Sequence, residues 1–264
     1  MSTSTWVLIH AYYAKELSKI LDHIKHVPQP NLIVATVPQC GNVSRITNQI
    51  EASGGTIILC KNLGFDIGGL IQAINSCDFN DNDIILKIHT KKDKETTESN
   101  ARCIVKRASE VIELFNNDCN LGMVGTAGRL VFLSSPESIG ANRAKYEEAA
   151  ERLGIPKGRL YHPFFAGTIF WIRGAILNHI KKCNYAIEEF EPPQIDHDFD
   201  PKEEFNAPAE YAVPSWINKN DYQFFEGAVY NKTTRIAFDG HKAHAFERIF
   251  CSLTAHLGYK YLAI

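Results

Sequence analysis

The sequence predicts an α/β protein whose central, mostly parallel β-sheet is covered by helices on both faces. Short, continuously apolar runs, which are typical of strands buried on both faces, alternate along the chain with amphipathic helical patterns. The chain has 264 residues, of which 45% are hydrophobic, so it can bury the core of one α/β domain. We therefore expect a single Rossmann-like domain over residues 1–264.

The expected strands and helices follow one another over most of the chain. The apolar runs predict strands at 5–10, 31–36, 55–60, 83–89, 121–126, 164–173 and 234–238. The helical patterns cover 15–27, 68–77, 99–115, 174–183 and 240–257. In the first helix, one face carries Leu17, Ile20, Leu21, Ile24 and Val27. In the helix at 99–115, the inward face carries Ile104, Ala108, Val111, Ile112 and Phe115.

Residues 186–223 interrupt this alternation. The segment is acidic, rich in proline and without apolar periodicity. Segments of this kind are usually long functional loops or unstructured insertions. We expect a long irregular loop or insertion near the site.

Composition excludes several classes of protein. The net charge is −2, so no global basic field favours nucleic acid. The seven cysteines are odd in number and form no CxxC pair, which argues against a disulfide framework and a zinc site. No run approaches the ~20 apolar residues of a membrane span, and no secretory leader is visible. We expect a soluble cytoplasmic protein, which leaves open peripheral membrane contact through a partner or a lipid-linked substrate.

The first polar motif, "KNLGFDIGGLIQAI", lies between an expected strand and an expected helix. Asn62 and Asp66 stand among Gly64, Gly68 and Gly69. Glycines allow a ligand to approach the backbone, and a helix start offers N–H groups to an anion. The alternative is a plain helix start with Asp66 as its N-cap. The stretch has neither the GxGxxG nor the GK[ST] spacing of nucleotide-binding loops.

The second motif is the polar end of the strand that contains the apolar run 84–88. His89, Thr90, Lys91 and Lys92 follow this run. Ligands of open α/β sheets bind at the carboxyl ends of strands, and phosphate favours charge-assisted hydrogen bonds. This segment therefore suits an anionic diphosphate, and the alternative is a solvated surface turn.

The third motif is "FDGHKAHAFERIF", at the start of the last expected helix. His244, Glu247 and Arg248 share one helical face, and Asp239 precedes Gly240. A carboxylate beside an imidazole and a guanidinium suits general-base chemistry and anion binding. The alternative is a helix capped by Asp239 that carries surface ion pairs.

Together these stretches resemble the rhamnan synthesis protein F family of glycosyltransferases. The matching segments run in order along nearly the whole chain: "IHAYYAKELSKILDHI", "NLGFDIGGLI", "ILKIHTKKD", "LGMVG", "FFAGTIFWIR" and "DGHKAHAFERIF". One departure is Phe65, where the family usually carries arginine. The segment 186–223 has no clear counterpart in the family, which leaves open a donor or acceptor different from that of the rhamnan enzymes.

The resemblance implies a GT-A-like fold and an inverting sugar transfer, in which the stereochemistry at the anomeric carbon is reversed. The donor would be a nucleotide-diphosphate sugar, with rhamnose the family default, and the acceptor a saccharide or lipid-linked saccharide in cell-surface polysaccharide synthesis. Many such folds hold a divalent metal on an Asp-x-Asp motif after the fourth strand. Here the sequence reads His89-Thr90-Lys91, so we expect no required cofactor, while Mg²⁺ or Mn²⁺ binding stays open.

The resemblance also implies roles for individual residues. We expect Glu247, and Asp239 as second choice, to act as the base. The donor-binding candidates are His10, Tyr12, Tyr13, Asn62, Asp66, His89, Thr90, Lys91, Lys92, His244 and Arg248. Phe165, Gly167 and Trp171 are expected on the acceptor side, although Trp171 in an apolar strand also suits the core. The alternatives are a phosphate-ester hydrolase or nucleotidyltransferase, with a metal held by several carboxylates, and a non-catalytic sugar- or nucleotide-binding module.

Overall fold

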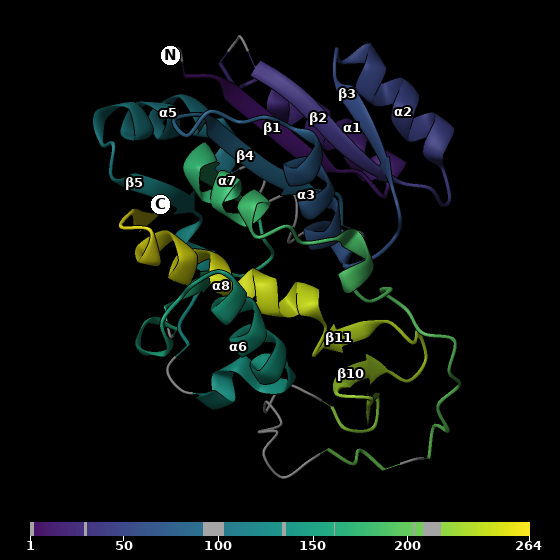
Figure 1. Cartoon of the computed structure of the whole chain (residues 1–264). Coiled ribbons are helices and arrows are strands. Elements are labelled where there is room, and N and C mark those ends of the chain that lie inside the picture. The colour runs from purple at the N-terminus through teal and green to yellow at the C-terminus, as the bar shows by residue number, and fades with distance from the viewer. Residues whose placement is uncertain are drawn as a thin grey trace.

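A computed structural model describes residues 3–28, 31–91, 103–133, 136–160, 162–202, 204–207 and 218–264. Its centre is a seven-stranded sheet in the order β12-β5-β8-β4-β1-β2-β3 (Figure 1). The strands are β1 (Thr5–His10), β2 (Asn31–Pro38), β3 (Thr56–Cys60), β4 (Ile84–His89), β5 (Leu121–Gly125), β8 (Phe170–Arg173) and β12 (Lys260–Ala263). Only β8 runs antiparallel to its neighbours in this sheet. The predicted α/β class with a mostly parallel sheet is confirmed.

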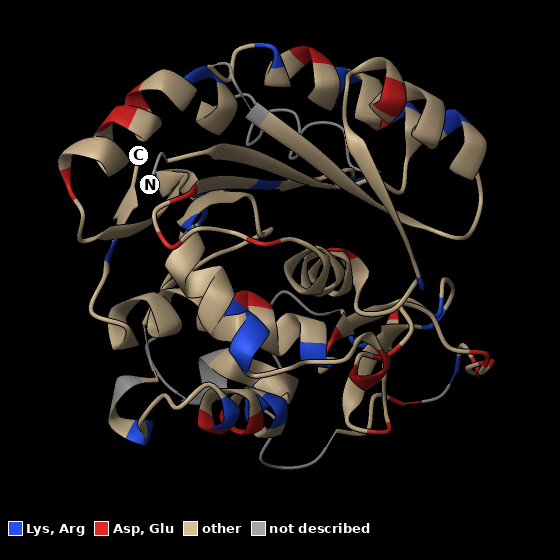
Figure 2. Cartoon of the chain, turned by 45° about the horizontal axis from the view of Figure 1, so that its top comes forward, with Lys and Arg blue, Asp and Glu red and all other residues tan. Residues whose placement is uncertain are grey.

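Helices cover both faces of the sheet, as predicted. One apolar core lies beneath α1 (Ala14–Ile24), α2 (Val43–Ala52) and α5 (Ala108–Asn117). The second lies beneath α3 (Phe65–Ser76), α7 (Gly174–Lys182) and α8 (Lys242–His256), and α6 (Arg143–Arg152) packs on the outside of α8. Figure 2 shows the charged side of the outer helices turned away from a largely uncharged sheet. The inward faces predicted for α1 and α5 are buried, with Leu21 and Ile112 only partly so.

Alternation along the central strands decides which side chains face which helices. In β4, Ile84, Leu86 and Ile88 belong to the core beneath α1 and α5, whereas Ile85 belongs to the core beneath α3 and α8. Lys87 has the same parity as Ile85, so it points toward α3. Trp171 has the opposite orientation and lies in the core beneath α1 and α5.

The expected strand at 164–173 is wrong as a single element. It consists of β7 (Phe164–Phe165), which pairs with β6 (Leu130–Val131), and of β8 in the central sheet. Between them the backbone turns at Gly167 and Thr168, whose φ angles are 87° and 50°. Two consecutive left-handed residues cannot continue a strand, which explains the break.

Several elements were not predicted from the sequence. These are α2, α6, β12 and two strands, β9 (Tyr222–Phe225) and β10 (Ala228–Asn231), of a separate three-stranded sheet. The third strand of that sheet, β11 (Ala237–Asp239), overlaps the strand expected at 234–238. Both helices have weak apolar patterns, because α2 buries only Ile46 and Ile50 and α6 buries mainly alanines. Short 3-10 helices complete the described elements: η1 (Ala127–Arg129), η2 (Pro136–Asn142), η3 (Lys157–Arg159) and η4 (Ile187–Glu189).

The structure excludes two helix caps that the sequence offered as alternatives. The N-cap of α3 is Gly64, with φ 64°, and Asp66 is already inside the helix. The N-cap of α8 is His241, two residues after Asp239. Both aspartates are therefore free to make contacts other than helix capping.

Part of the irregular segment 186–223 lies against the starts of α3 and α8. The N–H of Gly64 donates to the carbonyl of Glu191 over 2.8 Å. The carboxylate of Glu191 accepts from the N–H of Lys242 over 2.9 Å. Within the described residues, no helix combines the length and the apolar character needed to cross a membrane.

Candidate functional site

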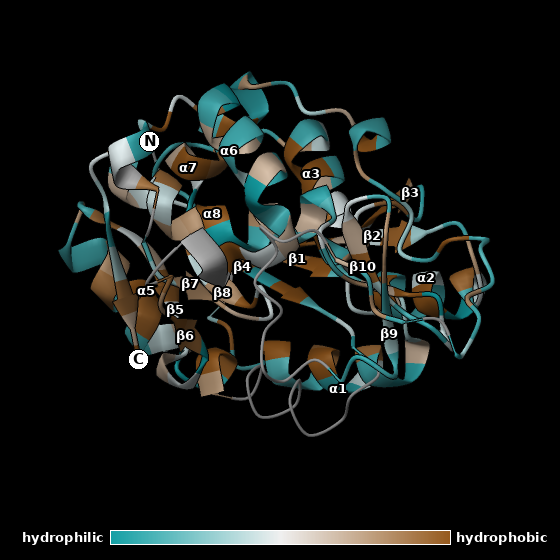
Figure 3. Cartoon of the chain, turned by 90° about the horizontal axis from the view of Figure 1, so that it is seen from below, coloured by the Kyte–Doolittle hydropathy of each residue, from teal (hydrophilic) through white to brown (hydrophobic). Residues whose placement is uncertain are grey.

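The candidate site lies at the carboxyl ends of β1 and β4. In the parallel pairing of these strands, His10 stands opposite His89. The start of α3, the turn between β7 and β8 and the first half of α8 complete the site. Figure 3 shows β1 and β4 near the middle of the molecule, beneath α3 and α8. This is the sheet edge at which open α/β folds bind ligands.

Asp66 is the centre of a compact polar cluster. One carboxylate oxygen, Oδ2, accepts hydrogen bonds from Lys87 Nζ and from the Thr168 hydroxyl. Lys87 Nζ also lies 2.7 Å from Thr168 Oγ1 and 3.3 Å from His89 Nδ1. The Lys87 side chain is 2% exposed and that of Asp66 is 20% exposed. The cluster thus fixes a buried ammonium against a carboxylate that still reaches the surface.

The electrostatics of the cluster keep Asp66 ionised. Burial alone would raise the pKa of this carboxyl, but the charge that His89 carries once it is protonated at low pH, the Lys87 ammonium and the hydrogen bonds from Lys87 and Thr168 outweigh it. The net result is a pKa well below the ordinary value. Burial lowers the pKa of His10 to about 4 and that of His89 to about 3, so both imidazoles are neutral at pH 7.

A small pocket beside the cluster opens between α3 and strands β1, β2 and β4. His10, Thr36, Asp66 and Lys87 provide its polar lining. His10 Nδ1 lies 3.1 Å from Thr36 Oγ1. Gly69 packs against this pair, because a Cβ at that position would lie 2.1 Å from His10 Nδ1. The glycine predicted for close approach therefore makes room for a side-chain pair of the protein itself.

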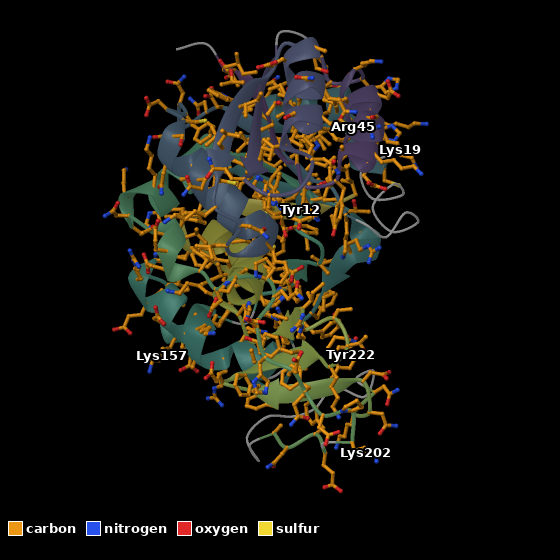
Figure 4. The ribbon with its side chains drawn as sticks, turned by 90° about the vertical axis from the view of Figure 1, so that its right-hand side faces the viewer. Tyr12, Lys19, Arg45, Lys157, Lys202 and Tyr222 are labelled. Atoms are coloured by element: carbon orange, nitrogen blue, oxygen red, sulfur yellow. The ribbon has the colours of Figure 1, made fainter. Side chains whose placement is uncertain are left out.

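Thr90 organises the loop that follows β1. Its hydroxyl oxygen accepts the N–H of Tyr12 over 2.8 Å and that of Tyr13 over 3.0 Å. The Tyr12 and Tyr13 rings meet edge to face at 4.8 Å, and Tyr12 is 39% exposed. In Figure 4, Tyr12 lies between the part of the protein that carries Lys19 and Arg45 and the small sheet that carries Tyr222. The two tyrosines are thus held at the surface beside the strand ends.

Glu247 on α8 is the second carboxylate of the site. Its Oε1 accepts the N–H of Gly167 over 2.6 Å, and its Oε2 lies 3.8 Å from Arg248 Nη1. Burial raises the pKa of Glu247, and the Arg248 guanidinium and the Gly167 hydrogen bond only partly oppose this. The Lys91 ammonium also acts on Glu247, which places Lys91 near the site. A raised pKa at a carboxylate is what a general base needs near neutral pH.

Asp239 has a different environment from Glu247. It is 3% exposed, and it accepts hydrogen bonds from Asn142 Nδ2 and, over 3.2 Å, from the Ala141 N–H. Arg248 Nη2 lies 3.3 Å from its Oδ1. Both oxygens are therefore occupied, so the geometry favours Glu247 over Asp239 as the base.

His244 packs at the start of α8, where its ring centroid lies 5.4 Å from that of Phe65. Burial, with smaller contributions from the charge of Arg248 and from His241, lowers the pKa of His244 to about 3. His244 is thus a neutral imidazole. Phe65 has φ 52° and contributes an apolar ring to this part of the site.

The turn at 166–168 connects the two carboxylates. The Gly167 N–H binds Glu247, and the hydroxyl of the next residue, Thr168, binds Asp66. A β-branched residue with φ 50° is a rare backbone conformation, and such residues cluster at functional sites. A strained turn thus joins the proposed donor side of the site to the candidate base.

Four predicted residues lie away from this arrangement or cannot be placed. Trp171 is fully buried on the opposite face of the sheet, and its Nε1 donates to the Ile104 carbonyl over 3.3 Å. It cannot reach an acceptor at the site. Phe165 is 2% exposed and packs on Gly125. Asn62 is partly exposed in the turn before α3, and Lys92 lies outside the described residues.

Lys87 and Thr168 were missed as site residues by sequence reasoning. A signal existed for Lys87, because a lysine within the apolar run "IILKIH" is rarely buried without a partner. Thr168 gave no signal, since "AGTIF" reads as part of a strand. Among the residues that the structure describes, no three His, Cys, Asp or Glu side chains gather as they would around a metal ion.

Fold and site together define a Rossmann-like α/β protein with paired carboxylates at the carboxyl ends of its central strands. The chain belongs to the rhamnan synthesis protein F family, whose family model matches residues 2–199. This confirms the family resemblance for the sequence motifs that lie within residues 2–199. Residues 200–264, which include α8 and Glu247, lie beyond the matched region.

The chain is also similar to two curated proteins, both named "Uncharacterized protein WxcX", from two strains of Xanthomonas campestris pv. campestris. Each is 26% identical over 203 residues, which cover 73% of this chain and 29% of the relative. The chain thus corresponds to less than a third of the length of these relatives. Among solved structures, a cytidylyltransferase from Leptospira borgpetersenii serovar Hardjo-bovis (strain JB197) aligns with a TM-score of 0.39 and 10% identity, over 72% of this chain and 68% of that one.

Proposed function

We propose that the chain is a glycosyltransferase of polysaccharide synthesis that moves a sugar, with inversion, from a nucleotide-diphosphate donor to a saccharide or lipid-linked saccharide acceptor. Family membership supports a role in rhamnan or related polysaccharide synthesis. The observation that carries the proposal is that two carboxylates in different environments, Asp66 and Glu247, lie at the same edge of the central sheet. Asp66 is held ionised, and Glu247 has a raised pKa. Two carboxylates with opposite shifts suit two different roles.

In this proposal the acceptor hydroxyl oxygen attacks the anomeric carbon of the donor sugar. The new C–O bond forms as the bond from that carbon to the diphosphate breaks, and the diphosphate leaves with the bonding electrons. Glu247 takes the proton of the acceptor hydroxyl. Lys91, whose charge acts on Glu247, would stabilise the negative charge that grows on the leaving group. Tyr12 and Tyr13, fixed by Thr90, supply flat surfaces for the nucleoside.

The test is a thermal-shift screen of nucleotide sugars, including the deoxythymidine-diphosphate rhamnose that is the family default. Each donor is added first with EDTA and then with Mn²⁺. A ligand at 100 times its Kd adds about 2.7 kcal/mol to the free energy of unfolding. For a domain of this size such an addition raises the Tm by several degrees.

The outcomes separate the candidate functions. Stabilisation by one nucleotide sugar, followed by its transfer to an acceptor, supports the proposal and names the donor. Stabilisation without transfer or hydrolysis in the presence of saccharide acceptors favours a non-catalytic binding module. Metal-dependent cleavage of phosphate esters, without sugar transfer, favours the alternative enzyme class. No shift with any nucleotide sugar, with or without metal, contradicts the proposal.

A further inference from the structure

Asp66 uses its two carboxylate oxygens unequally. Oδ2 receives Lys87 Nζ and the Thr168 hydroxyl, and His89 Nδ1 lies 3.5 Å from it. Within the described part of the chain, Oδ1 has no hydrogen-bond donor of the protein. The side chain remains 20% exposed although Lys87 behind it is almost fully buried. The cluster thus holds one oxygen toward the protein and leaves the other for a ligand.

Two features show that this orientation is enforced. Lys87 comes from the middle of a sheet strand, where β-sheet packing fixes the direction of its side chain. Thr168, whose hydroxyl binds Asp66, has a left-handed backbone conformation with φ 50°. Since β-branched residues avoid this region, the contact of Thr168 with Asp66 and Lys87 accompanies a local strain.

We propose that Lys87 and Thr168 are positioning residues of the donor site, which bind Asp66 Oδ2 and so present Asp66 Oδ1 to a hydroxyl or N–H group of the nucleotide sugar. A carboxylate repels phosphate, so this oxygen recognises the sugar, ribose or base of the donor and not its diphosphate. The inference rests on the proposed function for the identity of the ligand. The arrangement of the three side chains does not depend on it.

The charged and titratable groups that face Asp66 come from three elements. They are Lys87 and His89 from β4, His10 from β1, and His244 and Glu247 from α8. The three histidines have pKa values of about 3 to 4, so they stay neutral above pH 5. Glu247 has a raised pKa, so its own ionisation would add to any pH-dependent change at Asp66. For this reason the experiment is done in a Glu247→Gln background.

The first measurement is the titration of the Asp66 carboxyl carbon by ¹³C NMR, assigned with an Asp66→Asn variant. With Lys87 present, the signal should not change between pH 8 and pH 5. In Lys87→Met the opposing charge is gone and burial dominates, so the pKa of Asp66 should rise and the signal should titrate within this window. Thr168→Val should raise the pKa by a smaller amount, and Thr168→Ser, which keeps the hydroxyl, should restore the parent behaviour.

Matched controls separate positioning from general destabilisation. Lys242 is another mostly buried lysine, paired with Glu148 and Glu189, and Thr254 is a buried threonine whose hydroxyl donates to the Phe250 carbonyl. Lys242→Met and Thr254→Val should leave the Asp66 signal unchanged. If Lys87→Met does not fold, Thr168→Val and Thr168→Ser decide the question, because they remove or keep a single hydroxyl.

The second measurement is the affinity for deoxythymidine-diphosphate rhamnose, or for the nucleotide sugar that the screen identifies, between pH 5 and 8. Where Lys87→Met or Thr168→Val raises the Asp66 pKa into this range, affinity should fall up to tenfold for each pH unit below that pKa. An Asp66 signal that is identical in all variants overturns the inference. A shifted signal with unchanged donor affinity overturns the ligand role of Oδ1. A shifted signal in a protein that binds no nucleotide sugar upholds the positioning and instead refutes the proposed function.

Discussion

Replacing Glu247 by glutamine should remove catalysis while leaving the fold and donor binding intact. The glutamine side-chain oxygen can still accept the 2.6 Å hydrogen bond from the Gly167 N–H, so the turn keeps its partner. What the variant loses is the proton acceptor. Positioned general bases contribute roughly 10²- to 10⁴-fold to a rate, equivalent to about 2.7–5.5 kcal/mol of barrier. We expect the single-turnover transfer rate to fall by that factor.

The pH dependence provides a second test of the same residue. Burial raises the pKa of Glu247 above that of an ordinary glutamate, and a base acts only when it is deprotonated. Wild-type kcat/KM should therefore fall as the pH drops through this raised pKa, and the variant should lack that acidic limb. Transfer should be followed by product mass, with donor Kd measured separately. A variant that transfers sugar at the wild-type rate refutes the assignment, and one whose donor Kd rises by the same factor makes Glu247 a binding residue.

Asp239→Asn is the informative contrast, because the sequence offers both residues as bases. Asp239 is buried, and both of its oxygens accept hydrogen bonds. Oδ1 accepts from Asn142 and Arg248, and Oδ2 accepts from the backbone N–H of Ala141. Its replacement leaves a charged guanidinium with one partner fewer, a change that costs about 1–3 kcal/mol. We expect a lower denaturation midpoint with near-normal kcat in the folded protein. A stable variant that has lost transfer would move the base from Glu247 to Asp239.

Three further predictions concern the rest of the site. Lys91→Gln should weaken donor binding about tenfold or more, with a reduced salt dependence in calorimetric titrations, because charge-assisted hydrogen bonds contribute roughly 1.5–3 kcal/mol. Gly69→Ala should displace the imidazole of His10, since the new Cβ would lie 2.1 Å from its Nδ1. Gly128→Ala, where nothing lies within 4 Å, is the control, and equal donor affinity and Tm in the two variants would contradict the packing argument. Trp171→Ala should cost about 3–5 kcal/mol in denaturant unfolding, and acceptor KM should not change in Trp171→Phe.

The central layers were predictable from sequence because their signals are local and redundant. Strands such as 84–89 are short and mostly apolar, and α1 and α5 carry several apolar residues on one face. In contrast, α2 places only Ile46 and Ile50 in the core, so its periodicity is too sparse to detect. The break between β7 and β8 depends on the left-handed φ angle of Thr168. Because β-branched residues rarely adopt this conformation, the residue type does not predict it.

The site was predictable in outline but not in its pairings. Asp66, His89 and Glu247, which the structure brings together, were candidates because of their places near the start of α3, at the end of β4 and in the first half of α8. Which carboxylate keeps its oxygens available depends on neighbours far away in sequence. Asp239 is bound by Asn142, and Asp66 is bound by Thr168, 102 residues further along the chain. No local pattern contains this information, so both aspartates look equivalent in the sequence.

These pairings change what a diphosphate would meet at the site. From the sequence, the basic residues at the end of β4 were expected to bind the diphosphate in place of a metal ion. In the structure, however, Lys87 within β4 is bound to Asp66, and Arg248 lies between Asp239 and Glu247. Among the described residues, three cations therefore face three carboxylates: Lys87, Lys91 and Arg248 against Asp66, Asp239 and Glu247. A leaving diphosphate adds at least two negative charges to a site that is otherwise balanced. Of these three cations, only Lys91 has no carboxylate within ion-pair distance among the described residues. One unpaired cation does not balance two negative charges, so further positive charge must come from another source. Donor binding that persists in EDTA and weakens steeply with salt would assign that charge to further basic side chains, whereas binding that requires Mn²⁺ would assign it to a metal ion.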